Sequence, residues 1–179
     1  ALLLFGARPP AALAGIGVST RPRRRADSYM PCFLAGESQA RTMGAALQIL
    51  VYPFSHQEGH IAAALFGSGH LAWLKQPFLA FHFSGGTSEA LLVRPEEGGM
   101  DVQKVAGSLD LKAGQAVDRV GQMLGLPFPA GPQLEQLAAQ STRRFPAKPA
   151  MKGCDCSLSG VENRCRFMLE KGEAPADIA

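Results

Sequence analysis

Apolar residues recur along this chain in two alternating patterns, short continuous runs and longer stretches at helical spacing. Residues 13–18 and 49–54 are short runs of the kind that form buried strands. Between them, residues 33–47 place small and apolar side chains at helical spacing. The order strand, helix, strand favours an α/β layered fold.

A second series of elements follows Pro77, which ends a helix and loop that start at His56 and marks a candidate boundary between two lobes. Residues 78–83 and 90–93 predict a hairpin closed by a tight turn, and residues 101–105 predict a third strand.

The remainder of the chain predicts helices joined by proline-rich turns. An amphipathic helix is expected over residues 110–124, with Val117, Val120 and Leu124 on its apolar face. The other expected elements are a rigid turn at 127–132, a short helix at 133–140, a loop at 141–153 and a last helix from about Ser159.

Composition limits the function without choosing it. A chain of 179 residues with 46% hydrophobic content can bury one sizeable core or two small lobes. A net charge of +3 permits contact with a polyanion without requiring it. Four arginines gather in residues 21–25, a run typical of a solvated loop and also suited to phosphate contacts.

The cysteines and the first residues bear on location. Cys32, Cys154, Cys156 and Cys165 lack both the paired spacing of a zinc site and the density of a disulfide scaffold, which fits a reducing cytoplasm. The apolar residues 1–5 are too short to span a bilayer, so we expect no membrane association. We expect them to end a helix within a longer protein.

The segment His-Gln-Glu-Gly-His at residues 56–60 is the most informative in the chain. On a helix, His56 and His60 point to the same side and can hold one metal ion. Glu58 follows His56 by two residues, about 200° around the helix axis, where it cannot serve as the general base of a zinc protease. The same pair is also compatible with plain surface polarity.

Two further features suggest a nucleotide. The glycine pair in the turn Ser84-Gly-Gly-Thr87 allows backbone N–H groups to approach a phosphate, although most such pairs are simple turns. Asp118, near the glycine turn at Gly131, can bind ribose hydroxyls or pair with Lys112 or Arg119 as a solvated charge. Glu135, expected in the first turn of the next helix, is either a favourable helix-dipole charge or a second sugar contact.

These features occur in the order found in the TsaD family, also called Gcp and formerly described as O-sialoglycoprotein endopeptidases. The chain resembles this family from about residue 36 to residue 160, with nearly the family's spacing. The motifs that carry the resemblance lie at residues 56–64, 83–89, 107–120, 124–132 and 156–160.

The resemblance implies an actin-like ATPase fold of the ribonuclease H-like kind, incomplete at both ends. Residues 1–76 would be the remainder of the first lobe and residues 77–179 the start of the second. The implied reaction transfers a threonylcarbamoyl group from its adenylate to N6 of adenosine 37 in tRNA. The implied ligands and partners are iron or zinc, threonylcarbamoyl-adenylate or ATP, tRNA, protein partners of a threonylcarbamoylation complex, and a second subunit in a homo- or heterodimer.

The resemblance also assigns residues, none of them a catalytic side chain. His56 and His60 would ligate the metal. The residues that would line the nucleotide phosphates are Phe83, Ser84, Gly85, Gly86 and Thr87, and those that would contact the nucleoside are Asp118, Gly131 and Glu135.

The chain departs from the family pattern at several positions. Thr87 stands where the family usually has His, Leu111 where it has a second Asp, and Gln115 where it has Glu. The family's Gly-Pro-Gly loop is replaced by the longer, arginine-rich residues 21–30. The chain therefore resembles a divergent bacterial paralogue.

The ends of the chain also matter to the expected activity. The family's first phosphate loop would precede Ala1, and a metal-ligating Asp and an adenosine-contacting Asn would follow Ala179, so we expect these residues alone to be inactive. Two other functions stay open: a catalytically silent nucleotide-binding partner or scaffold, and a metallopeptidase.

Overall fold

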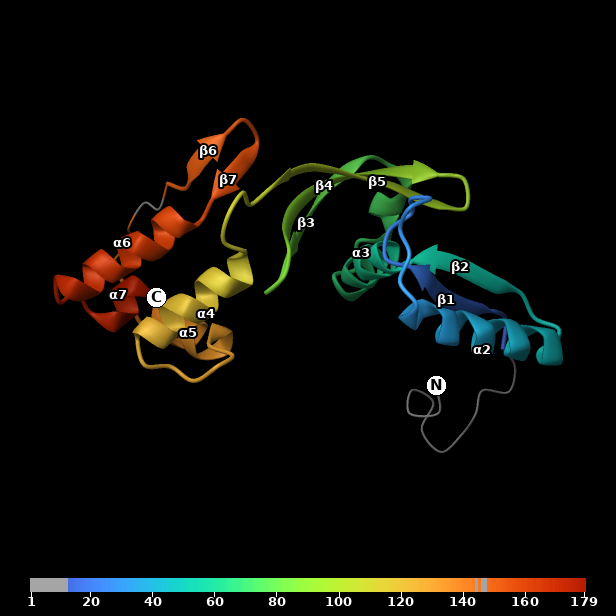
Figure 1. Ribbon diagram of the computed structural model, residues 1–179, viewed down its shortest axis with the longest axis horizontal. Helices are drawn as coiled ribbons and strands as arrows, with labels where there is room; N and C mark the ends of the chain where they lie inside the picture. The colour runs from blue at the N-terminus through green and yellow to red at the C-terminus, as the bar shows by residue number, and fades with distance from the viewer. Residues whose placement is uncertain (1–12, 144, 146–147) are drawn as a thin grey trace. The chain divides into compact units, whose positions relative to one another are not determined.

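The computed structural model describes residues 13–143, 145 and 148–179 (Figure 1). The helix end expected at residues 1–5 lies outside this range. The elements follow the order β1 (Ile16–Arg21), α2 (Cys32–Leu47), β2 (Val51–Ser55), α3 (His56–Gly67), the 3-10 helix η1 (Leu71–Lys75), β3 (Phe78–Phe83), β4 (Ser88–Glu96), β5 (Gly99–Gly107), α4 (Ala113–Met123), α5 (Gly131–Ala138), β6 (Ala150–Lys152), β7 (Asp155–Ser157), α6 (Ser159–Glu170) and α7 (Pro175–Ile178).

The strands of the described residues form three small sheets, β1–β2, β3–β4–β5 and β6–β7. This is the mixed α/β class that the alternating sequence pattern predicted. The chain divides into two units. The first consists of Ala1–Phe78 and Val93–Val102, and the second consists of Leu79–Leu92 and Gln103–Ala179. None of the described helices is both long and apolar enough to cross a membrane.

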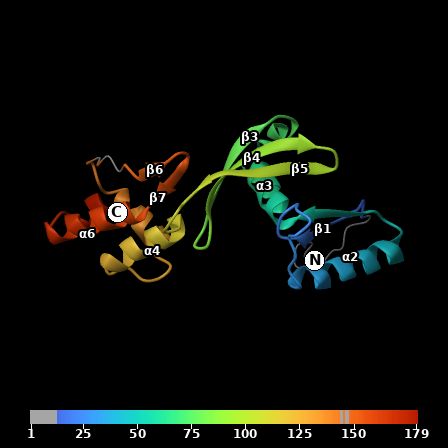
Figure 2. The ribbon, with the colours of Figure 1, turned by 45° about the horizontal axis from the view of Figure 1, so that its top comes forward.

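The first unit contains a β-α-β arrangement. β1 and β2 are parallel, with Ile16 opposite Val51, and α2 connects them and packs against β1 (Figures 1 and 2). Gly44 allows α2 to approach β2 closely as well, because a side chain there would overlap the side chain of Val51, the first residue of β2. β1 begins three residues later than predicted, since its register is set by β2: the Ile16 N–H donates to the Leu50 carbonyl (2.9 Å).

The three-stranded sheet has β4 at its centre and contributes to both units. Leu91 and Val93 of β4 are each 1% exposed, as expected of the strand with a neighbour on either side. The predicted hairpin and the predicted third strand are both confirmed.

The second unit buries its core among helices. Val120 of α4, Leu134 of α5, Met168 of α6 and Ile178 of α7 form one buried cluster. Val120 belongs to the face that the helical spacing predicted to be apolar. The short helix α7 was not predicted.

Three predicted boundaries in this unit are wrong. α4 starts at Ala113 and not at Asp110, because Lys112 is extended (φ −82°, ψ 151°). α5 starts at Gly131, with Pro132 in its first two positions, so Glu135 lies beyond the first turn in which it was expected. The predicted loop 141–153 ends in β6, which pairs with β7 across Gly153 at φ +64°, a conformation that favours glycine.

Candidate functional site

The two histidines of the metal motif lie at the start of α3. Ser55 caps this helix: its Oγ accepts from the Glu58 N–H (3.2 Å), while Glu58 Oε2 accepts from the Ser55 N–H (2.7 Å). This reciprocal capping box fixes the first turn, so His56 and His60 project from the same side. Their Nε2 atoms are 3.0 Å apart and both side chains are exposed. The predicted convergence of the rings is present.

Glu58 points away from the imidazoles, as its spacing predicted. Its side chain is only 5% exposed, and its Oε1 accepts from the Met100 N–H (3.0 Å) and from Arg24 Nη1 (3.3 Å). Burial alone would raise the pKa of Glu58, but the hydrogen bonds from Ser55 and Met100 and the charge of Arg24 outweigh it, and the pKa lies below its ordinary value. The carboxylate is therefore committed to structure, which removes the base that a metallopeptidase would need.

The turn at residues 84–87 is closed by the side chain of its first residue. Ser84 Oγ accepts from the N–H groups of Gly86 (3.3 Å) and Thr87 (3.0 Å), and the Ser84 N–H donates to the Thr87 carbonyl (2.8 Å). The glycines themselves are exposed, and a Cβ added at Gly85 or Gly86 would meet open space. The outer side of the turn is thus free of side chains, while the N–H groups of Ser84, Gly86 and Thr87 donate within the turn.

The first turn of α4 packs directly on this hairpin turn. The Gly114 N–H donates to the Ser84 carbonyl (3.2 Å), and a Cβ at Gly114 would lie 2.6 Å from the backbone nitrogen of Gly85. The Ala113 N–H donates to Ser88 Oγ (2.7 Å). A glycine is required at residue 114 because only a residue without a side chain allows this approach. The positive end of an 11-residue helix therefore adjoins the exposed turn.

Asp118 is joined to the start of α5, the helix that carries Gly131 and Glu135. Asp118 Oδ1 accepts from the N–H of Ala130, the residue before Gly131 (2.9 Å). Glu135 follows one helical turn after Gly131 and is exposed.

Asp118 does not make the ion pairs expected of a solvated charge. Arg119 pairs with Glu162 (3.1 Å), and the Lys112 ammonium donates to the Ser108 carbonyl (3.1 Å). Within the described part of the chain, the bond to Ala130 is the one recorded for the Asp118 carboxylate.

Asp110 is a key polar residue that the sequence analysis did not assign. Its carboxylate accepts from Ser159 Oγ (2.6 Å) and from the N–H groups of Leu158 (2.8 Å) and Ser159 (3.3 Å), at the start of α6. These bonds, led by the one from the Ser159 hydroxyl, hold the pKa of Asp110 well below its usual range. The carboxylate joins two of the sequence motifs, residues 107–120 and 156–160. Both motifs belong to the set that carries the family resemblance, and this was the signal in the sequence that they could lie together.

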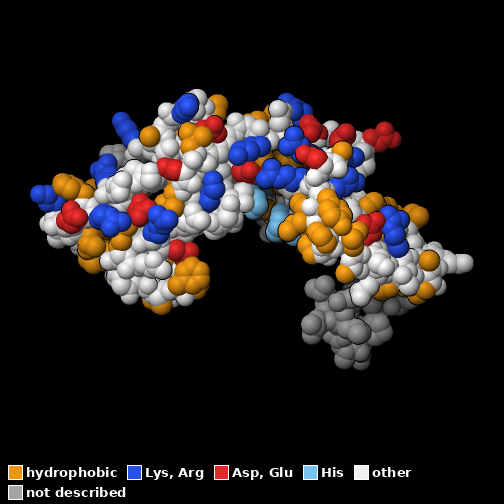
Figure 3. Space-filling model, viewed as in Figure 1, with side chains coloured by type: hydrophobic (Ala, Val, Ile, Leu, Met, Phe, Trp, Pro, Cys, Tyr) orange, Lys and Arg blue, Asp and Glu red, His pale blue; other side chains and the backbone are white. Residues whose placement is uncertain are grey.

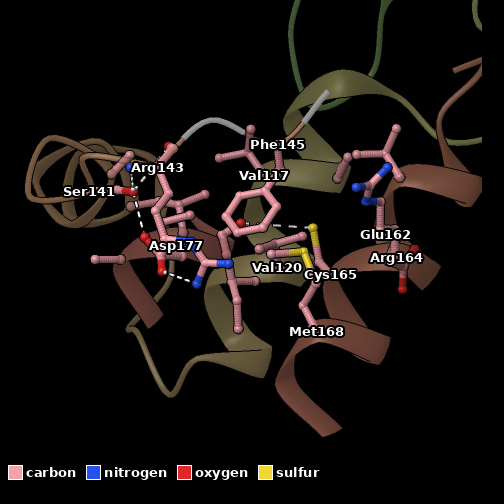
Figure 4. A pocket seen from close by; sticks show the side chains of 17 residues that line it. Val117, Val120, Ser141, Arg143, Phe145, Glu162, Arg164, Cys165, Met168 and Asp177 are labelled. Atoms are coloured by element: carbon pink, nitrogen blue, oxygen red, sulfur yellow. Dashed lines mark hydrogen bonds and ion pairs between the residues drawn. The ribbon is translucent and has the colours of Figure 1, made fainter. Parts of the chain in front are cut away.

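A separate cavity of about 370 Å³ lies between the helices of the second unit (Figure 4). Its walls are largely apolar, with Val117, Val120 and Met168 among them, and Arg143 and Asp177 pair at its rim (3.1 Å). Burial raises the pKa of the Cys165 thiol that lines it, which lowers the fraction of the nucleophilic thiolate at neutral pH. None of the predicted site residues borders this cavity.

The structure therefore presents two separate groups of predicted residues. The histidines belong to the first unit, and Ser84 to Thr87, Asp118, Gly131 and Glu135 belong to the second. Among the described residues, no group of three His, Cys, Asp or Glu side chains is placed to hold a metal ion.

Comparison with known proteins adds a family. Residues 29–179 match the family model TsaD, described as tRNA N6-adenosine threonylcarbamoyltransferase. A protein of that name from Enterococcus faecalis is 33% identical over 92% of this chain and 46% of the relative. One from Thermus thermophilus is 34% identical over 87% of this chain and 46% of the relative. A third, from Lacticaseibacillus casei, is 35% identical over 73% of this chain and 37% of the relative. The chain spans about half the length of the curated relatives it matches, and it belongs to the TsaD family.

Proposed function

We propose that the protein containing this chain transfers a threonylcarbamoyl group from its adenylate to N6 of adenosine 37 in tRNA. The observation that carries the proposal is the pair of converging imidazoles in a chain whose relatives bear the name of that transferase. Because the chain covers only part of those relatives, the activity belongs to the complete protein.

The imidazole geometry fits a divalent metal. Two nitrogens bound about 2.0–2.1 Å from one ion, at angles between about 90° and 110°, are about 2.8–3.4 Å apart, and the Nε2 atoms of His56 and His60 are 3.0 Å apart. Nitrogen ligands suit iron and zinc. Such an ion would supply Lewis acidity toward a carbonyl oxygen. Since catalytic sites normally use three protein ligands, a further ligand from elsewhere in the protein would complete this one.

His56 and His60 are held for this purpose by the capping box of α3. The Ser55–Glu58 bonds orient the first helical turn, and Phe33 lies against the His56 ring with centroids 5.6 Å apart. A preset pair loses less conformational freedom when it binds an ion.

The second unit supports nucleotide binding. The outer side of the turn 84–87 carries no side chain at its two glycines, and the positive end of the α4 dipole adjoins it, which favours a nearby anion such as a phosphate of ATP or of threonylcarbamoyl-adenylate. Phe83 precedes this turn and is 62% exposed. Asp118, with one carboxylate oxygen bonded to Ala130, keeps the other for a ribose hydroxyl, and Gly131 and Glu135 border the same place.

The wider arrangement follows from the same proposal. The chain would supply parts of two actin-like lobes, residues 1–76 and 77–179, in a cytoplasmic enzyme. Further subunits of a threonylcarbamoylation complex, or a second copy of the protein, would be its partners.

The test uses the complete gene product and tRNA isolated from cells that lack the modification. Mass spectrometry of digested nucleosides should detect threonylcarbamoyladenosine with the wild type and none with His60→Ala, which should also lose most of its bound metal. His70→Ala is the matched control, since His70 is also exposed and packs on Trp73 (5.1 Å between ring centroids). Wild-type protein that binds nucleotide but forms no product would favour the silent scaffold instead.

Asp118→Asn separates structure from binding in the same protein. Asparagine keeps an oxygen for the Ala130 N–H, so the fold should persist, while the loss of the charge should weaken nucleotide binding by about 1–3 kcal/mol. Unchanged affinity by calorimetry would remove Asp118 from the site.

A further inference from the structure

The loop between β1 and α2, residues 21–30, carries Arg21, Arg23, Arg24 and Arg25 and is called here the arginine loop. The sequence left two functions open for it, a solvated loop or a phosphate contact. Its position and the contacts of Arg21, Arg24 and Arg25 decide between them.

Both ends of the arginine loop lie beside His56. At its start, Arg21 is paired in register with Ser55, and the Pro22 carbonyl accepts from the Gln57 N–H (3.1 Å). Just after its end, the ring of Phe33 lies against that of His56. A molecule that reaches the imidazoles therefore lies next to this loop.

The loop is held in shape from within. The Arg23 N–H donates to Ser28 Oγ (2.9 Å), and the Ser28 N–H donates to the Arg25 carbonyl (3.1 Å). Such local bonds fix the backbone before any ligand arrives, which lowers the entropic cost of binding.

Arg24 anchors the loop to the β4–β5 turn. Its guanidinium contacts Glu58 Oε1 (3.3 Å), Glu96 Oε2 (3.6 Å) and the carbonyl of Glu97 (3.2 Å). Figure 3 shows basic side chains in blue, with acidic ones in red between them, over the region of this turn. The charge of Arg24 is thus compensated within the protein, and Arg24 is not the phosphate ligand.

Arg21 and Arg25 are different. Both side chains are exposed, and within the described residues no ion pair is recorded for either. Arg21 also borders a hollow of about 310 Å³ that reaches down to Ser55 and Glu58, with Tyr52 on another wall.

We propose that Arg21 and Arg25 bind backbone phosphates of the RNA strand that brings its adenosine to the His56–His60 pair. The assignment rests on the proposed function, which requires a tRNA at the imidazoles. An RNA strand is the ligand that uses both cations, because it presents successive phosphates, while Arg24 keeps the loop in place between them.

The experiment measures binding of unmodified tRNA to the complete protein by fluorescence anisotropy over a series of salt concentrations. Each lost phosphate contact lowers the slope of log K against log salt by about 1, so Arg21→Ser with Arg25→Ser should lower it by about 2 and weaken binding at least about tenfold at 0.1 M salt. Arg21→Lys with Arg25→Lys should keep most of the slope, since lysine also binds phosphate as a point charge.

The matched control is Arg41→Ser with Arg94→Ser, which removes the same charge from two exposed arginines of the same unit that pair with Glu37 and Asp101. It should leave the salt slope nearly unchanged. A slope unchanged in the Arg21 and Arg25 variant, or an equal loss in the control, would overturn the assignment.

Product formation is measured on the same preparations and separates the two hypotheses. Wild-type protein that modifies tRNA while the Arg21 and Arg25 variant binds with the wild-type slope refutes the loop assignment alone. If the salt slope falls in the Arg21 and Arg25 variant but the wild-type protein forms no modified nucleoside, the proposed reaction is refuted and the loop remains an RNA contact.

Discussion

Replacing Glu58 tests how the histidine-bearing helix is held in place. Glu58→Ala removes one half of the α3 capping box, a loss of about 0.5–2 kcal/mol. It also leaves the N–H of Met100, a residue that is 8% exposed, without its acceptor, which costs about 1–3 kcal/mol. The ion pair with Arg24 adds at most about 1 kcal/mol, because the Arg24 side chain is 35% exposed and screened by water.

Together these losses predict a destabilisation of about 1.5–6 kcal/mol for Glu58→Ala. Glu58→Gln should cost less, about 1 kcal/mol, because glutamine keeps an acceptor oxygen and is itself a capping-box residue. Glu37→Ala is the control, since Glu37 makes an i,i+4 pair with Arg41 worth only about 0.2–0.5 kcal/mol.

Urea denaturation followed by the fluorescence of Trp73 measures these differences. Trp73 is the single tryptophan and lies in η1, which packs against α3, so its signal reports on the first unit. A loss below about 0.5 kcal/mol for Glu58→Ala, equal to that of Glu37→Ala, would refute the anchoring function of Glu58.

The same carboxylate predicts a pH dependence. The pKa of Glu58 in the folded chain lies below its ordinary value of 4.5, so the unfolded chain takes up the proton first as the pH falls. Its contribution to stability is complete above the unfolded pKa and is lost as the pH falls from there through the folded pKa. The free energy of unfolding should therefore fall less steeply in acid for Glu58→Gln than for the wild type.

Two further substitutions test the second unit. Gly121→Ala should destabilise it by about 1–3 kcal/mol in thermal denaturation, because the new methyl group would overlap the fully buried Ala130. The control Gly160→Ala faces open space on α6 and should be neutral or stabilising. Equal effects of the two substitutions would contradict the packing. Asp110→Asn should speed amide hydrogen exchange at the start of α6, at Leu158 in particular, because it weakens the acceptor of that N–H; unchanged protection there would show that Asp110 is dispensable for α6.

Local signals in the sequence predicted the parts of the fold that depend on neighbouring residues. The helix expected to start at His56 does so, and the structure adds the capping box of Ser55 and Glu58, a signal in the sequence that had not been used. The strands on either side of the turn 84–87 were predicted because their apolar residues are bounded by glycines. The convergence of His56 and His60 followed from helix periodicity alone.

Contacts between distant residues were beyond the same reasoning. Asp110 looked like the first residue of a helix, but its carboxylate is used by Leu158 and Ser159, 48 and 49 residues away. Arg24 looked like one of four equivalent loop arginines, yet it pairs with Glu58, which is 34 residues away in the sequence. Periodicity does not report which distant backbone groups need a partner.

The three departures from the family pattern do not weigh equally against activity. Gln115 Oε1 accepts from the Lys112 N–H (3.2 Å), the bond that a glutamate would make at this position of α4, so this exchange preserves the start of the helix. Leu111 is 6% exposed, and an aspartate there would be a largely buried charge. Leucine removes that charge and packs as an apolar side chain in the same buried position. Thr87 ends the exposed turn and its N–H already donates to Ser84 Oγ. Of the three exchanges, Gln115 therefore keeps the local hydrogen bond, whereas Thr87 and Leu111 remove an imidazole and a carboxylate from the expected pattern.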